Sequence, residues 1–340
     1  LHQRKERFVR HFPIPILMIL LAGCSQQGTT LSSSSALSSS PSDAPLAQGK
    51  LWTQHGGQLF WDDQAVLTHV RNQISLLRHR KLLINHKTLR KQVRARTEAK
   101  ANIVNPACAH SEPKAMGSLY RPLNKHTLAV FTFADDGSYH CGTGVAIGHD
   151  AIVTNCHVLH TVPNETLFAA MDSTGNVYPI KEILASNLKD DIVILRLDMG
   201  KKTLCPAPLA KTLPDPGTEV FQIGHTREEF FSATRGHIIR YYRADRENNG
   251  VSFRVGSFDI SNKVSAGGSG SGLFNARGEL VGIYTYRTWY YQDSESTIKV
   301  PKQPDGSTEY IDKISIYARH SCVPVTEIHA LILSKPDKKK

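Results

Sequence analysis

Residues 266–286 read AGGSGSGLFNARGELVGIYTY. A glycine-rich run surrounds Ser269 and leads directly into Leu273-Phe274, a turn at 275–278 and an apolar run at 280–284. Two short apolar runs separated by a turn predict an antiparallel pair of strands. A run of Gly and Ser is more often a flexible linker, but a linker is not followed at once by strands. The stretch therefore predicts a serine held in a tight loop at the start of a strand.

The same alternation of short apolar runs and turns continues on both sides, from Met116 to the last residues before Pro324. The further runs lie at 128–133, 145–147, 151–153, 192–197, 220–223, 236–242 and 251–255. Many short strands with little helix between them predict an all-β domain, and a domain of this length can close two small barrels. Residues 325–334, after Pro324, predict a short C-terminal helix.

Two upstream motifs supply the other parts of a serine nucleophile. Residues 152–158 read IVTNCHV, and residues 190–195 read DDIVIL. A serine hydroxyl is a poor nucleophile until a base takes its proton. Histidine suits that role near neutral pH, and a carboxylate can hold the imidazole in the required tautomer. The order histidine, aspartate, serine separates these motifs from the α/β-hydrolase and subtilisin arrangements.

Together with CGTGV at 141–145, these motifs resemble the trypsin-like serine peptidases of the chymotrypsin fold. The resemblance covers about residues 117–330 and is greatest to bacterial extracytoplasmic members such as the periplasmic heat-shock proteases. It implies two six-stranded antiparallel β-barrels with an active site between them. By motif position it implies His157 as general base, Asp191 as orienting acid and Ser269 as nucleophile. The backbone amides of Gly267 and Ser269 would form the oxyanion hole.

Three neighbouring residues are alternatives for these roles, namely His160, Asp190 and Ser271. The family context Thr-Asn-x-His-Val favours His157, and the family places its aspartate directly before the apolar strand, which favours Asp191. The pattern Gly-x-Ser-Gly-x-x-Leu selects Ser269. We therefore expect the three neighbours to be structural residues.

Gly268 departs from the pattern of the members that are made as zymogens. Those enzymes carry an aspartate at this position, which pairs with an N-terminus freed by cleavage. Residues 100–104, KANIV, resemble such a cleavage site only faintly. The resemblance therefore implies an enzyme that is competent without this cleavage, or one that is gated by another device.

The first residues have the pattern of a bacterial lipoprotein signal. A basic stretch at 1–11 precedes an apolar run at 12–22, and small residues then precede Cys24. The apolar run is too short to span a bilayer comfortably. We expect a signal at 1–23, lipidation of Cys24 and a Ser-rich flexible tether at 24–47; an ordinary secretory peptide is the alternative. Ser25 favours the outer membrane, so the predicted location is the bacterial cell envelope, facing the periplasm or the cell surface.

The net charge of +11 is concentrated in one segment, residues 48–115. Between residues 71 and 100 ten Lys or Arg side chains oppose the single Glu98. Leu67, Val70, Ile74 and Leu77 recur at helical spacing and predict an amphipathic helix. The segment could be a solvated helix packed on the domain, a contact with anionic lipid, or an inhibitory pro-segment. Nucleic acid is not expected as a partner, because no groove-reading motif accompanies the charge.

Five cysteines remain if Cys24 is lipidated, which is an odd number. Cys141 and Cys156 flank the histidine loop much as the cysteines of the family's most widespread bridge do, although Cys156 precedes the histidine where the family's second cysteine follows it. Pairing of Cys108 with Cys205 would resemble the bridge that ties the pro-segment in chymotrypsin. Cys322 would then be free.

The sequence thus predicts four segments: 1–23, 24–47, 48–115 and a protease domain at 116–335, with barrels at about 117–205 and 206–323. The expected function is a serine endopeptidase that hydrolyses protein or peptide substrates through an acyl-enzyme. A catalytically lapsed binding or chaperone-like lipoprotein is the alternative. The remaining histidines lack ligand spacing, so no metal and no cofactor is expected.

Overall fold

A computed structural model describes the chain from residue 51 to residue 333 with internal gaps. The described ranges are 51–55, 58–105, 112–134, 138–160, 167–242, 245–248, 251–254, 258–299 and 310–333. The predicted signal, Cys24 and the tether lie outside the described residues, as does Cys108. In the part of the chain that is described, no helix has the length and apolar character needed to cross a membrane.

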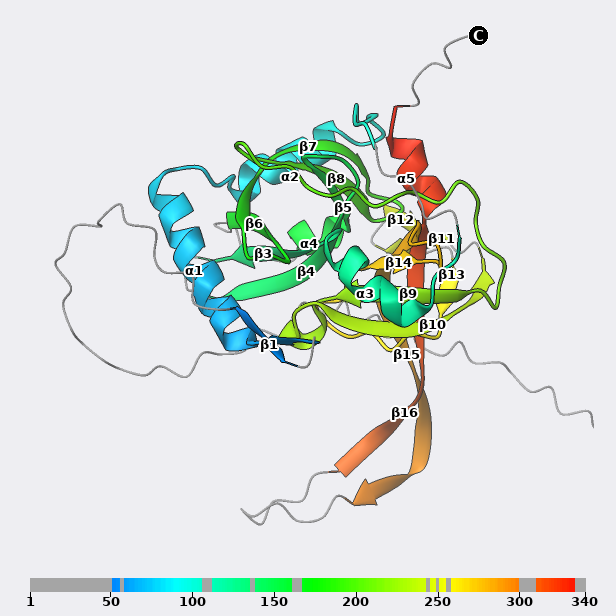
Figure 1. Ribbon diagram of the computed structural model, residues 1–340. Helices are drawn as coiled ribbons and strands as arrows, with labels where there is room; N and C mark the ends of the chain where they lie inside the picture. The colour runs from blue at the N-terminus through cyan, green and yellow to red at the C-terminus, as the bar shows by residue number, and fades with distance from the viewer. Residues whose placement is uncertain are drawn as a thin grey trace, which may run out of the picture. The chain divides into compact units, whose positions relative to one another are not determined.

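Six antiparallel strands close a first barrel in the order β3-β4-β5-β8-β7-β6 (Figure 1). Their bounds are β3 Thr127–Phe133, β4 Tyr139–Ala146, β5 Ala151–Thr154, β6 Leu167–Asp172, β7 Val177–Asn187 and β8 Ile192–Leu197. All seven side chains of β3 are buried. Alternate residues belong to different apolar clusters, because successive side chains of a strand point to opposite faces. Leu128 and Val130 pack with one cluster, and Ala129 and Phe131 pack with the other.

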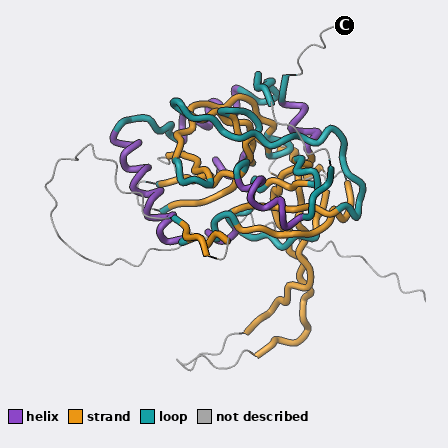
Figure 2. The backbone as a smooth tube through the Cα atoms, in the orientation of Figure 1, coloured by secondary structure: helices purple, strands orange, loops and turns teal. Residues whose placement is uncertain are grey.

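A second closed barrel follows in the order β10-β13-β16-β15-β14-β9. Its strands are β9 Glu219–Gly224, β10 Ser232–Tyr241, β13 Phe258–Ile260, β14 Gly272–Phe274, β15 Leu280–Lys299 and β16 Tyr310–Pro324. The pair β11 Asp245–Asn248 and β12 Val251–Arg254 forms a small separate sheet. The predicted fold class is confirmed: the protein is mainly β, with two six-stranded antiparallel barrels. Figure 2 distinguishes the strands by colour from the helices and loops.

Five α-helices accompany the barrels in the described residues: α1 Asp63–His79, α2 His86–Ala95, α3 Met116–Asn124, α4 Cys156–His160 and α5 Val325–Leu331. The helix α5 is the predicted C-terminal helix and buries Val325, Ile328 and Leu331, which share one face at spacings of three. Its Leu331 carbonyl accepts a hydrogen bond from the Ala101 amide at 2.7 Å. The chain before the first barrel therefore contacts the C-terminal helix.

The predicted amphipathic helix of the basic segment is α1. Asp62 caps its first turn, where one side-chain oxygen accepts a hydrogen bond from the Ala65 amide at 2.9 Å. Leu67, Val70 and Ile74 are buried as the spacing predicts, and Val66 joins them. A short hairpin, β1 Trp52–His55 with β2 Gln58–Trp61, precedes this helix. The apolar face of the segment is thus packed within the protein, while its cationic side chains stay largely exposed.

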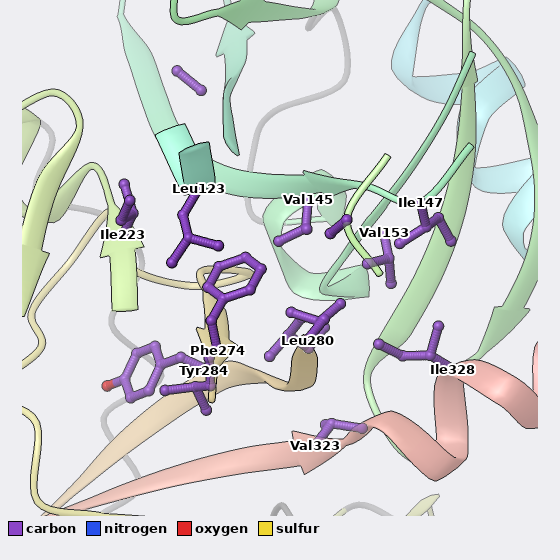
Figure 3. Close-up of a cluster of buried hydrophobic side chains, with 14 of the residues drawn as sticks. Leu123, Val145, Ile147, Val153, Ile223, Phe274, Leu280, Tyr284, Val323 and Ile328 are labelled. Atoms are coloured by element: carbon purple, nitrogen blue, oxygen red, sulfur yellow. The ribbon is translucent and has the colours of Figure 1, made fainter. Parts of the chain in front are cut away.

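One apolar cluster is shared by the two barrels, and Figure 3 shows part of it. It includes Val145 and Val153 from the first barrel and Ile223, Phe274 and Leu280 from the second. These side chains are removed from water, and burial of one such large aliphatic or aromatic side chain is worth roughly 1.5–3 kcal/mol. The shared cluster therefore holds the two barrels together behind the loops that connect their strands.

By its internal contacts the chain divides into two compact units. One unit contains residues 21–287 and 319–340, with both barrels and α1–α5. Residues 288–318 belong to the other unit, which includes parts of β15 and β16.

Candidate active site

The end of β5 and the start of β8 bring His157 and Asp191 together. His157 is the second residue of α4, and Asp191 directly precedes β8. β5 and β8 are paired antiparallel, so Thr154 lies opposite Val193. The side-chain amide of Asn155 donates to the Asp191 carbonyl at 2.9 Å, and the Cys156 amide donates to the same oxygen at 3.3 Å. Asp191 has a φ of 56°, a conformation that is uncommon outside glycine.

The Asp191 carboxylate makes two bonds to His157. One oxygen, Oδ1, accepts from the His157 backbone amide at 2.9 Å, and Oδ2 lies 2.5 Å from the ring nitrogen Nδ1. This arrangement fixes both the position of the ring and its orientation. The other ring nitrogen, Nε2, lies 2.8 Å from Ser269 Oγ. The structure therefore brings the side chains of Asp191, His157 and Ser269 within hydrogen-bond distance of one another in that order.

The environment of His157 raises its pKa. Burial of the ring acts to lower the pKa, but the charge of Asp191 and its hydrogen bond to the ring both act to raise it. The net result is a pKa above the ordinary value of 6.5. The carboxylate thus stabilises the imidazolium that forms when the ring takes a proton.

Ser269 lies in the loop between β13 and β14, and we name residues 265–271 the nucleophile loop. Strand β4 holds this loop through Thr143. The Thr143 amide donates to the Ser269 carbonyl at 2.8 Å, and the Thr143 hydroxyl donates to the Gly267 carbonyl at 2.9 Å. Gly270 has a φ of +85°, and a Cβ there would lie 1.9 Å from the Thr143 carbonyl oxygen, so only glycine fits.

The peptide between Ala266 and Gly267 is oriented by a hydrogen bond. The Ala266 carbonyl accepts from the Arg227 amide at 2.7 Å. In a trans peptide the N–H points opposite to the C=O, so the Gly267 amide is directed away from Arg227. Gly267 itself has a φ of +87°. Among the described residues, no backbone carbonyl accepts from the amides of Gly267 or Ser269, which leaves both N–H groups for an oxyanion.

Gly268 has no space for the carboxylate that the zymogen enzymes carry at this position. A Cβ on Gly268 would lie 2.2 Å from a methyl group of Val264 and 3.0 Å from the Ser265 carbonyl oxygen. The first distance is below any real contact of a Cβ atom, so a larger side chain would require the loop to shift.

Two of the alternative residues have structural roles. The Asp190 carboxylate accepts a hydrogen bond from the Asn187 side-chain amide at 2.7 Å. The buried Ser271 hydroxyl donates to the Gly268 carbonyl at 2.5 Å. Both therefore stabilise turns beside the site. The side chain of His160 lies outside the part of the structure that is described.

The structure does not form the predicted bridge between Cys141 and Cys156, and both are free thiols. The Cys156 sulfur contacts the Ile192 carbonyl at 3.2 Å, whereas the Cys141 sulfur contacts the carbonyl of Gly142 at 3.4 Å. Cys156 precedes His157, and its buried side chain packs against β8. Its sulfur therefore contacts β8 and not Cys141. Cys205 is a free, exposed thiol in the structure, and its predicted partner Cys108 lies outside the described residues.

Within the described ranges, no three His, Cys, Asp or Glu side chains gather in a group that could hold a metal ion. The sequence did not identify Thr143, Asn155 or Arg227 as residues of the site. Thr143 lies in the CGTGV motif. The motif contributed to the resemblance, but it did not indicate that Thr143 contacts the nucleophile loop. Arg227 carried no signal, because it acts through its backbone amide.

Comparison with known proteins finds a family model whose matched range includes His157, Asp191 and Ser269. Residues 142–283 match the family of the trypsin-like peptidase domain. The crystal structure of an inactive serine-to-alanine mutant of Rv3671c from M. tuberculosis is similar, with a TM-score of 0.45 and 15% sequence identity over 66% of this chain and 95% of that chain. No curated protein matches the sequence.

Proposed function

We propose that this chain is a serine endopeptidase with His157, Asp191 and Ser269 as its catalytic triad. The match of residues 142–283 to the trypsin-like peptidase domain supports this proposal. The observation that carries this proposal is the pair of contacts made by the His157 ring, 2.5 Å to Asp191 and 2.8 Å to Ser269. These distances are within hydrogen-bond reach for proton transfer from Ser269 to the ring. The substrates of such an enzyme are proteins or peptides.

The first half-reaction forms an acyl-enzyme. Ser269 Oγ attacks the carbonyl carbon of the scissile peptide as His157 Nε2 takes the hydroxyl proton. The carbonyl oxygen becomes an oxyanion, which accepts hydrogen bonds from the Gly267 and Ser269 amides. His157 then gives its proton to the amine nitrogen, the C–N bond breaks, and the amine product leaves.

The second half-reaction returns the enzyme to its starting state. Water attacks the ester carbon while His157 Nε2 takes one of its protons. The C–O bond to Ser269 breaks, and His157 returns the proton to Ser269 Oγ. Asp191 stays ionised throughout and stabilises the imidazolium in both halves. The cycle consumes one water and produces one carboxylic acid and one amine.

We also propose that the enzyme works in the bacterial cell envelope, anchored by lipid on Cys24. The support is the basic stretch, apolar run and cysteine at residues 1–24, which lie outside the described residues. A single acyl chain binds a bilayer only weakly, whereas several chains together with basic residues bind it stably. The exposed cations of α1 and α2 would add to this attraction at an anionic surface.

Labelling with a fluorophosphonate probe tests the proposed triad. The probe reacts with an activated serine, so intact-mass measurement should show one adduct on the wild-type protein. Ser269→Ala should show none, and its kcat on a peptide substrate should fall by about 10⁶-fold. The matched control is Ser271→Ala, which removes a hydroxyl of the same loop and should keep the adduct.

The result that contradicts the proposal is a folded wild-type protein that takes no label and cleaves no peptide. That outcome favours a lapsed enzyme with a binding or chaperone-like role. A substrate-protecting activity that persists in Ser269→Ala would support the same alternative.

A further inference from the structure

The nucleophile loop is supported by a second loop, residues 225–231, which we name the support loop. It lies between β9 and β10 and includes the short 3-10 turn η1 Thr226–Glu228. The Arg227 amide donates to the Ala266 carbonyl at 2.7 Å. A Cβ on Gly267 would lie 2.1 Å from the His225 carbonyl oxygen, so the two backbones are in direct contact. The support loop therefore determines how the Gly267 amide is directed.

The support loop has a backbone that its own sequence does not favour. Arg227, Glu228 and Phe231 have φ values of 54°, 65° and 56°, in the left-handed region that non-glycine residues rarely adopt. Each such residue costs of order 1 kcal/mol and persists only when surrounding contacts hold it. Contacts with the surrounding protein must therefore hold the support loop in this conformation.

Contacts from the N-terminal segment, residues 51–79, meet the support loop at its far end. Asp63, the first residue of α1, accepts a hydrogen bond from the Phe230 amide through Oδ1 at 3.0 Å. The Trp61 ring stacks on the Phe231 ring with centroids 4.5 Å apart. Tyr120 of α3 links the two, because its hydroxyl accepts from the Trp61 indole at 3.4 Å and donates to the Phe231 carbonyl at 2.9 Å.

Contacts within the loop connect this end to the nucleophile loop. The Phe231 amide donates to Nδ1 of the buried His225 at 3.2 Å, and the two rings meet edge to face at 4.7 Å. Burial lowers the pKa of His225 to about 3. The ring is therefore neutral at physiological pH, and Nδ1 can accept this hydrogen bond. The carbonyl of the same His225 is the group that contacts Gly267.

A second contact chain reaches the middle of the loop. The Tyr139 hydroxyl donates to Glu228 at 2.8 Å, and the guanidinium of Arg71 from α1 lies 5.1 Å from the centre of the Tyr139 ring. The N-terminal segment is thus linked to the support loop in two ways, directly through Asp63 and Trp61 and indirectly from Arg71 through Tyr139 of β4. Neither series of contacts includes His157, Asp191 or Ser269.

We propose that Asp63 and Trp61 are positioning residues for the oxyanion hole, which they hold in its working geometry through the support loop. This inference rests on the proposed function, because it assigns the hole to the Gly267 and Ser269 amides. It also gives the N-terminal segment a role opposite to that of an inhibitory pro-segment: the segment is needed for full activity.

The test compares three variants of the full chain at neighbouring positions. Asp63→Ala removes the acceptor for the Phe230 amide, whereas Asp63→Asn keeps an oxygen acceptor at the same place. Asp62→Ala removes the cap of α1 but no contact to the support loop that the structure shows. We expect Asp63→Ala to lower kcat by about tenfold with little change in KM, less than the 10²- to 10³-fold cost of deleting an oxyanion donor. Asp63→Asn should restore most of the rate, and Asp62→Ala should lower thermal stability without lowering kcat.

Amide hydrogen exchange, measured in a Ser269→Ala background, reports the coupling without catalysis. Exchange in residues 225–231 and 265–269 should accelerate in Asp63→Ala and stay unchanged in Asp62→Ala. If Asp63→Ala fails to fold, Tyr120→Phe tests the same link, because it removes the hydroxyl bonded to Phe231 and keeps the ring. An unchanged kcat together with unchanged exchange in these variants overturns the inference. Faster exchange in Asp63→Ala, combined with a wild-type protein that takes no fluorophosphonate, would instead count against the proposed function alone.

Discussion

The contact between Asp191 and His157 sets the pH range in which this site can work. Only the neutral imidazole can take the proton of Ser269, so protonation of His157 stops the first step. Its pKa lies above 6.5, because the charge and hydrogen bond of Asp191 outweigh the effect of burial. Activity should therefore rise with pH through a midpoint above 6.5.

Asp191→Asn should change both the rate and this midpoint. The amide cannot stabilise the imidazolium, so burial alone then acts and the pKa of His157 falls below 6.5. In kcat/KM measured from pH 4 to 9, the acid limb should move to lower pH, and kcat should fall by about 10⁴-fold. Asp190→Asn should leave the acid limb where it is. A limb that stays in place in Asp191→Asn would show that another group controls it.

Strand β4 is the element that joins the first barrel to the nucleophile loop of the second. Its residue Thr143 contacts the loop twice, through the backbone amide and through the hydroxyl. The Thr143 carbonyl in turn accepts a hydrogen bond from the Thr154 hydroxyl of β5 at 2.6 Å. Two neighbouring strands of one barrel therefore fix the loop that extends from the other.

Thr143→Val should weaken this junction while the size of the side chain is conserved. The change leaves the half-buried Gly267 carbonyl without its hydroxyl donor, which costs about 1 kcal/mol in the free energy of unfolding. Urea denaturation measures that loss, and the rate of fluorophosphonate labelling should fall with it. Thr143→Ser keeps the hydroxyl and should retain the labelling rate. Equal rates in the valine and serine variants would mean that the backbone amide alone holds the loop.

The sequence predicted the elements that local patterns specify, and it missed the contacts that the fold creates. Strands β3, β4, β5, β8, β9, β10, β14 and β15 contain apolar runs that are visible in short windows, as do α5 and the apolar face of α1, whereas β6, β7, β13 and β16 were not predicted. The bond from Phe230 to Asp63 joins residues 167 positions apart, and no motif marks either partner. The bridge from Cys141 to Cys156 was wrong because loop position was used in place of side-chain direction, and Cys156 packs inward against β8.

At the scale of the whole molecule, the basic segment belongs to the folded unit and is more than a spacer. Its helix α1 buries one face against the shared apolar cluster, and its cations stay largely exposed. Of the three interpretations that the sequence left open, the packing of a solvated helix on the barrels is the one that these contacts support. Contact of the exposed cations with anionic lipid stays a prediction.

The proposed anchoring of the whole chain can be tested by fractionation of expressing cells. The wild-type protein should sediment with membranes and incorporate labelled palmitate, because lipid on Cys24 would hold it there. Cys24→Ser should move the protein to the soluble fraction and abolish the label. Cys205→Ser, which alters an exposed free thiol, should keep the membrane location. A wild-type protein found only in the soluble fraction would contradict the lipid anchor.

Because the start of α1 contacts the support loop, proteolytic removal of this segment should lower the activity of the protein. In trypsin-like peptidases that are made as zymogens, proteolysis between a leading segment and the barrels switches the enzyme on. Here Gly268 leaves no space for the carboxylate on which that switch depends, and Asp63 and Trp61 already hold the loop in the uncut chain. Cleavage after α1, followed by loss of the segment, would lower the rate. For this protein, proteolytic processing after α1 would be a way to turn activity down.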